Sequence, residues 1–132
     1  MVDGISKIVQ KKFSVLCKYL FGDDVHLRQN NKIVSCLNRG GVALLNVSYD
    51  DKASIFHYLL ALKADEEYLY LFDPYYRKRK FSDTALIWLG NTNDDRQAPN
   101  LKVERKRLDM YQHKKYSMGL SDERECCIIE RI

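Results

Sequence analysis

The chain has 132 residues, of which 45% are apolar and 30% are charged. That length suits a single domain over residues 1–132, and the apolar fraction excludes a wholly disordered chain. Lys and Arg exceed Asp and Glu by 22 to 18, so the formal charge of +4 permits a polyanionic partner without requiring one. No apolar run reaches the roughly 18 residues of a membrane span, and the first residues lack the apolar core of a signal peptide. We therefore expect a cytoplasmic protein with no membrane partner.

Residues 1–40 are expected to form the helical region of this domain. Apolar side chains recur at helical spacing from 5 to 20, which predicts an amphipathic helix. A second, shorter helix is expected over 31–38, because Asn31 is a favourable N-cap and the Gly40–Gly41 pair follows the last turn. Both helices precede every strand that the pattern predicts.

Residues 41–132 are expected to be mainly β. Strands are predicted over residues 42–47, 53–62, 67–73 and 126–132, a short helix over 82–89, and either state over 101–110. The order of helices first and strands afterwards indicates an α+β domain, in which N-terminal helices pack on a largely antiparallel sheet.

The hairpin predicted over 55–76 brings a histidine and an aspartate together. If its turn is the three residues 64–66, His57 lies directly opposite Asp73 on the same face. Such neighbours have Cβ atoms about 4.5 to 5.5 Å apart, within reach of a hydrogen bond. An imidazole held by a carboxylate is the base and orienter of a nucleophilic triad. The alternative is a satisfied polar contact at the rim of a sheet.

The segment 40–74 joins that pair to a longer pattern. Gly40–Gly41 precedes an apolar run, His57–Tyr58 opens a strand, and Asp73–Pro74 ends the next one. This arrangement resembles the second half of papain-like cysteine peptidases, and within them the bacterial branch that processes double-glycine bacteriocin leaders. The resemblance implies a papain-like half-barrel, a peptide or protein substrate, His57 as general base and Asp73 as its orienting partner.

The nucleophilic half of that family is not matched. Its cysteine begins a long helix upstream of the histidine, where the helix N-terminus lowers the thiol pKa. Cys17 is the candidate that the resemblance offers, with Cys36 as an alternative. Both lie inside expected helices, where burial would raise the thiol pKa instead. The chain therefore resembles the His/Asp half of a peptidase, and a partner chain or a second copy of this chain could supply the thiol.

Three classes of function stay open. The first is a cysteine-peptidase-like hydrolase, and the second is a non-catalytic interaction module with the same fold. The third, less favoured than a solvated loop, is nucleic-acid binding through the basic run Arg77–Lys80 and its aromatic neighbours. The cysteines lack zinc-site spacing, His26 and His113 have no ligand-like partners, and no phosphate-binding glycine motif occurs. No metal or cofactor is therefore expected.

Overall fold

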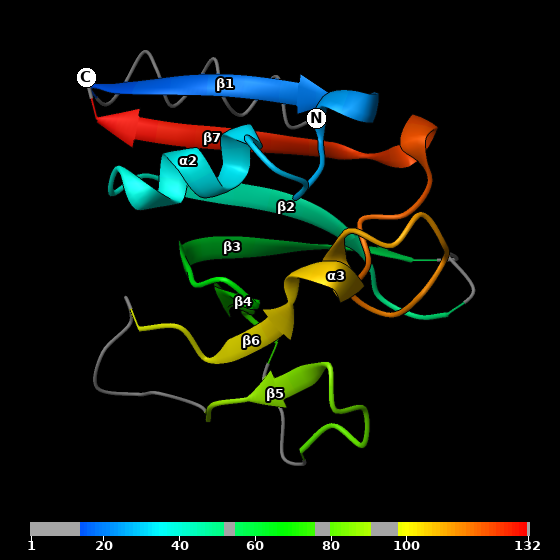
Figure 1. Cartoon of the computed structure of the whole chain (residues 1–132). Coiled ribbons are helices and arrows are strands. Elements are labelled where there is room, and N and C mark those ends of the chain that lie inside the picture. Colours follow the sequence, from blue (N-terminus) through cyan, green and yellow to red (C-terminus); the bar gives the residue numbers. More distant parts are fainter. Residues whose placement is uncertain (1–13, 52–54, 76–79, 91–97, 132) are drawn as a thin grey trace.

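The computed structural model describes residues 14–51, 55–75, 80–90 and 98–131. The strands are β1 (Val15–Phe21), β2 (Val42–Ser48), β3 (Phe56–Ala64), β4 (Tyr68–Phe72), β5 (Leu86–Trp88), β6 (Leu101–Glu104) and β7 (Glu125–Arg131). The helices of these residues are α2 (Lys32–Asn38) and α3 (Arg105–Leu108), with 3-10 turns η1 (Gly22–Asp24) and η2 (Ser121–Glu123). All seven strands form one antiparallel sheet in the order β1-β7-β2-β3-β4-β6-β5, and α2 lies across one face of it (Figure 1).

The expected α+β architecture, with N-terminal helices packed on a papain-like half-barrel, is wrong. The described chain is mostly antiparallel sheet with two short α-helices, and its first element is strand β1, which lies inside the region 1–40 that was expected to be helical. The helix predicted over 5–20 is therefore wrong from residue 15 onward, and residues 1–13 lie outside the described residues. All of β1 pairs with β7, more than a hundred residues away along the chain. That pairing decides the conformation, because apolar spacing alone fits a strand as well as a helix in so short a run.

The short helix predicted over 82–89 is also wrong. The Asp83 side chain accepts a hydrogen bond from the Ala85 backbone N–H at 3.0 Å, which makes a tight turn instead of a helix cap. The chain then enters β5, which pairs with β6. The ambiguous stretch 101–110 contains both states, since β6 passes directly into α3.

Other local predictions are confirmed. Asn31 caps α2, and its side chain accepts a hydrogen bond from the Val34 backbone N–H at 2.7 Å. Strand β2, the hairpin of β3 and β4, and the C-terminal strand β7 lie where alternation and apolar runs predicted strands. Strand β7 lies between β1 and β2, so it is an interior strand of the sheet.

The core fills the face of the sheet that α2 covers. Buried aliphatic side chains of β2, β3, β4 and β6 pack there, together with Cys36 and Cys126. Gly41 lets α2 approach β7, because a Cβ atom at this position would lie 2.5 Å from the Cys36 sulfur and 2.8 Å from the Ile129 carbonyl oxygen. Cys17 and Cys127 form a smaller buried cluster on the opposite face. Adjacent Cys126 and Cys127 therefore point to opposite faces, as strand alternation predicted.

A buried arginine fastens the segment between α3 and β7. The Arg124 guanidinium is fully buried and donates hydrogen bonds to the backbone oxygens of Gly119 (2.8 Å) and Val25 (2.9 Å). It also pairs with the Asp109 carboxylate at 2.7 Å, and the Tyr111 ring centre lies 3.5 Å from it. The chain at Val25, the chain around Asp109 and Tyr111, and the arginine's own loop thus meet on one side chain, and a carboxylate compensates its charge.

Replacing Arg124 by methionine should make the protein much less stable. The Asp109 carboxylate and the backbone oxygens of Gly119, Val25 and Asp109 would lose their donor, which we expect to lower the free energy of unfolding by about 3 to 5 kcal/mol. Urea denaturation followed by circular dichroism measures this loss. The control Arg131→Met changes an exposed arginine and should stay within about 0.5 kcal/mol of the parent protein. A loss below about 1 kcal/mol for Arg124→Met would show that the buried contacts contribute little.

Candidate functional site

His57 and Asp73 meet, although not through the register that the sequence predicted. The His57 Nε2 atom lies 2.7 Å from Asp73 Oδ1. The hairpin pairs Leu60 with Phe72, whereas the predicted register paired it with Tyr70. A β-bulge between Ala61 and Lys63 displaces the pairing near the turn by one further residue. Near His57 the shift is two residues, which leaves His57 and Asp73 on one face. It makes Asp73 a diagonal neighbour of His57 instead of a direct one, and diagonal neighbours are still within reach of long side chains.

The Asp73 carboxylate is buried and surrounded by donors. Besides His57, it accepts a hydrogen bond from the Tyr116 hydroxyl at 2.7 Å and from the Tyr75 backbone N–H at 2.9 Å. Burial raises the pKa of Asp73, but the hydrogen bonds from these three donors outweigh it and hold the pKa below its ordinary value of 3.8. Asp73 is therefore an ionised carboxylate over the physiological pH range.

Asn100 fixes the backbone of the same aspartate. Its Oδ1 atom accepts a hydrogen bond from the Asp73 N–H, and its Nδ2 atom donates to the Asp73 carbonyl oxygen, both at 2.8 Å. Asn100 precedes β6, which is the neighbour of β4 in the sheet. The strand end that carries Asp73 is thus fastened from the next strand, which limits how far the carboxylate can turn.

Tyr116 is the member of this network that sequence reasoning missed. It is fully buried with a left-handed backbone φ of 60°, which is uncommon for a bulky residue. Its N–H donates to the Ser48 carbonyl oxygen at 2.7 Å, and the Ser48 N–H donates to the Ser117 oxygen at 2.8 Å. This pair of bonds joins the segment to the end of β2 and directs the phenol at Asp73. No local sequence signal distinguishes this tyrosine from the eight others in the chain.

The imidazole of His57 keeps one nitrogen for other chemistry. Its Nε2 atom faces an ionised carboxylate, so the neutral ring carries its proton there and leaves the Nδ1 lone pair as an acceptor. Among the residues that the structure describes, Nδ1 has no hydrogen-bond partner. The side chain is 20% exposed, and the Tyr49 ring stands edge-on to it with centroids 5.3 Å apart. The ring is therefore held in place and oriented, and its Nδ1 edge is open in that no described residue bonds to it.

Further aromatic rings and a cation pack on Tyr49 and Tyr116, the rings that contact His57. Tyr75 packs against Tyr49 with centroids 5.9 Å apart. The Lys115 ammonium lies 5.5 Å from the ring centres of both Tyr49 and Phe81, and 5.8 Å from that of Tyr116. An ammonium over aromatic faces is attracted by their negative charge density. It places a positive charge on the aromatic cluster that includes Tyr49, whose ring contacts His57, a feature that the sequence did not indicate.

Cys17, the nucleophile candidate, is not brought to this pair. It lies in β1 and packs with Cys127 against Tyr58. Tyr58 follows His57 in β3, and adjacent strand residues point to opposite faces, so the sheet separates Cys17 from the imidazole. Burial raises the pKa of the Cys17 thiol, which opposes thiolate formation.

The alternative, Cys36, also lies away from the histidine. Its sulfur lies 3.5 Å from the Val42 carbonyl oxygen, at the start of β2, whereas His57 pairs with Val47 near the end of that strand. Five residues of strand span about 16 Å. Burial, with the nearby Glu130 carboxylate, raises the pKa of Cys36 to about 11.

The C-terminal pair completes the set of four cysteines. Cys126 pairs with Leu45 of β2, so a whole strand lies between it and β3, and burial raises its pKa to about 12. Cys127 points to the face opposite the core, with Cys17. All four cysteines of the sequence are described, and each is buried away from His57.

The other motifs contribute little to a site. Arg77, Lys78 and Arg79 of the basic run lie outside the described residues, and Lys80 is exposed. His113 pairs with the Glu123 carboxylate at 2.8 Å, while the His26 ring accepts a hydrogen bond from the backbone. In the ranges that the structure describes, no three His, Cys, Asp or Glu side chains gather as metal ligands, and no helix has the length and apolarity to cross a membrane.

Comparison of the chain with protein-family models, curated proteins and solved structures found no match. The resemblance to papain-like peptidases therefore stays a prediction, and a function has to be inferred from the geometry of the site.

The Asp73 network should give the protein a specific dependence on acid. The folded-state pKa of Asp73 is depressed, so its ionised form contributes stability above pH 3.8, which is lost as the pH falls through the folded-state pKa. Asp73→Asn should therefore lower the free energy of unfolding by about 1 to 3 kcal/mol at pH 5, and by clearly less at pH 2.5. Urea denaturation at the two pH values measures both differences.

The control for this experiment is Asp23→Asn, which changes an exposed carboxyl group in η1. As a substitution of an exposed side chain, it should change the free energy of unfolding by less than about 0.5 kcal/mol. An Asp73→Asn effect that did not shrink in acid would mean that the ionised carboxylate is not what the network stabilises.

Proposed function

We propose that this protein is a cysteine-peptidase-like domain that binds peptide and carries the base half of a nucleophilic site. His57 is the general base and Asp73 is its orienting partner. The observation that carries the proposal is the 2.7 Å contact between His57 Nε2 and an Asp73 carboxylate that is buried and held by Tyr116. The pattern of residues 40–74, which resembles the family, supports peptide as the class of ligand.

The geometry suits one particular proton transfer. A thiol presented at the open edge of the ring would give its proton to His57 Nδ1, leaving a thiolate to attack a carbonyl carbon. The negative charge of Asp73 stabilises the imidazolium that forms, and the hydrogen bond at Nε2 keeps the ring in the required tautomer. Tyr116 acts one step further out, as a positioning residue for the carboxylate.

The chain's own cysteines do not complete this site, because all four are buried away from His57. In this proposal the thiol belongs to another polypeptide, and the isolated chain binds peptide without hydrolysing it. Exposed apolar side chains on the face of the histidine support contact with a polypeptide: Ile55 is 56% exposed and Tyr75 51%.

A second candidate function is a non-catalytic peptide-binding module. The burial of every thiol favours it, since a nucleophilic thiol needs both access and a lowered pKa. The two candidates differ in whether His57 accepts a proton from a thiol that is supplied from outside.

An added thiol tests the proposal directly. With N-acetylcysteamine and p-nitrophenyl acetate, the sulfur attacks the ester carbonyl, a thioester forms, p-nitrophenolate leaves, and the thiol proton passes through His57 to solvent. We expect the thiol-dependent release of p-nitrophenolate to be at least about tenfold faster with the parent protein than with His57→Ala. Asp73→Asn should also be slower, because the tautomer is no longer fixed.

The matched control is His26→Ala, which removes another histidine far from Asp73 along the chain and should keep the parent rate. Equal thiol-dependent rates in the parent protein and His57→Ala would contradict the general-base role of His57. The non-catalytic peptide-binding module would then be the remaining candidate function.

Alkylation tests the statement about the chain's own cysteines. The thiolate is the form that reacts with iodoacetamide. Burial raises the pKa of three of these thiols: that of Cys17, that of Cys36 to about 11, and that of Cys126 to about 12. Iodoacetamide at pH 7 should therefore modify the folded chain slowly, and at the same rate in His57→Ala. Intact-mass spectrometry counts the modified thiols, and protein unfolded in urea provides the reference in which all react. A fast-reacting cysteine that His57→Ala slowed would place a nucleophile within this chain.

A further inference from the structure

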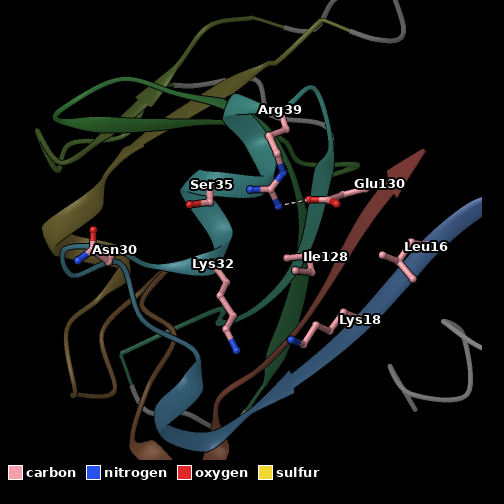
Figure 2. Close-up of a pocket in the computed structure, with 8 residues that line it drawn as sticks. All are labelled: Leu16, Lys18, Asn30, Lys32, Ser35, Arg39, Ile128 and Glu130. Atoms are coloured by element: carbon pink, nitrogen blue, oxygen red, sulfur yellow. Dashed lines mark hydrogen bonds and ion pairs between the residues drawn. The ribbon is translucent and has the colours of Figure 1, made fainter. Parts of the chain in front are cut away.

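A groove of about 370 Å³ lies apart from the histidine, between α2 and the strands β1 and β7 (Figure 2). Among the described residues, α2 packs over β2, β3 and β7 and leaves Leu16 and Lys18 of β1 without cover on the core-side face. Leu16 is consequently 52% exposed, and Lys18, two residues on, lies on the same side of β1. Lys32, Ser35 and Arg39 line the groove from one side of α2.

The charges of this groove are not balanced. Arg39 of α2 pairs with Glu130 of β7 across it, which neutralises both. Lys18 and Lys32 have no ion-pair partner among the described residues. Their side chains extend toward the same end of the groove, as Figure 2 shows. Two uncompensated ammonium groups therefore lie at one end, and an ion pair lies at the other.

The floor of the groove is apolar. Ile128 of β7 and Leu16 of β1 lie diagonally across from each other, since Leu16 pairs with Glu130 and Lys18 pairs with Ile128. A ligand that fits has an anionic group for the two lysines, next to an apolar group for these two side chains. The volume is within the range of about 300 to 1,000 Å³ that small-ligand sites have.

We propose that this groove binds an acidic peptide segment, with a carboxylate side chain between Lys18 and Lys32 and a neighbouring aliphatic side chain on Leu16 and Ile128. The choice of a peptide rests on the proposed function, which it extends by naming a preference for acidic and aliphatic residues. The binding itself involves neither His57 nor Asp73.

The test uses the full chain, labelled with ¹⁵N, and the peptide N-acetyl-Ala-Leu-Glu-Ala-amide. Titration should shift the backbone amide signals of residues 16–18, 32–39 and 128–130. The peptide with Gln in place of Glu has the same shape without the charge, and should bind about tenfold more weakly. Binding of the Gln peptide with equal affinity, or shifts confined to other residues, would overturn the proposal.

Two double variants separate the groove from general charge attraction. Lys18→Gln with Lys32→Gln should weaken binding of the acidic peptide about tenfold. Lys63→Gln with Lys106→Gln removes the same charge from exposed sites outside the groove, and should leave the affinity unchanged. Equal weakening by the two double variants would overturn the proposal, because the peptide would then be responding to net charge alone.

The outcomes for the two proposals are distinguishable. His57→Ala should bind the peptide in the groove as the parent protein does. If the protein binds the acidic peptide but shows no thiol-dependent rate, the proposal for the groove stands and the proposal for the general base fails. If the protein shows the thiol-dependent rate but does not bind the acidic peptide in the groove, the proposal for the general base stands and the proposal for the groove fails.

Discussion

The buried carboxylate of Asp73 is the constraint on which this end of the molecule depends. An ionised group removed from water is costly unless donors replace its hydration. Those donors come from separate regions of the chain: His57 from β3, the Tyr75 backbone N–H, and the Tyr116 hydroxyl. Each donor is itself fixed, Tyr116 by the backbone bonds it shares with the end of β2. The geometry of the imidazole therefore follows from the need to compensate one charge, and any catalytic use of His57 depends on that compensation.

The features of the fold that local chemistry determines could be predicted from the sequence. Asn31 caps α2 as expected, and alternation placed His57 and Asp73 on one face even though the register differed by two residues. The features that distant pairing determines could not be predicted. Strand β1 is set by β7 at the other end of the chain, and Tyr116 reaches Asp73 from 43 residues away. Neither contact leaves a periodicity in the residues around it, so the sequence identified the histidine and aspartate but not the tyrosine.

The correction to β1 changes the position of Cys17 but not the direction of its pKa shift, because the expected helix also held this thiol in its interior. In a helix, a cysteine near the N-terminus gains from backbone donors that stabilise a thiolate. In an antiparallel strand no such donors exist, and Cys17 instead lies on the face of the sheet opposite His57. Burial raises its pKa and those of Cys36 and Cys126. The molecule thus combines a well-oriented base with thiols that are protonated at neutral pH, and this combination favours a nucleophile from outside the chain.

The base and the groove are far enough apart to act separately. Ile128 in the groove pairs with Ala43 of β2, whereas His57 pairs with Val47 of the same strand. Four residues along that strand and two strands across correspond to about 16 Å. Charges interact little beyond a Debye length, about 8 Å at physiological ionic strength. Replacing Lys18 or Lys32 therefore leaves the field at Asp73 nearly unchanged, so an effect of those lysines on peptide affinity reports on the groove and not on the histidine.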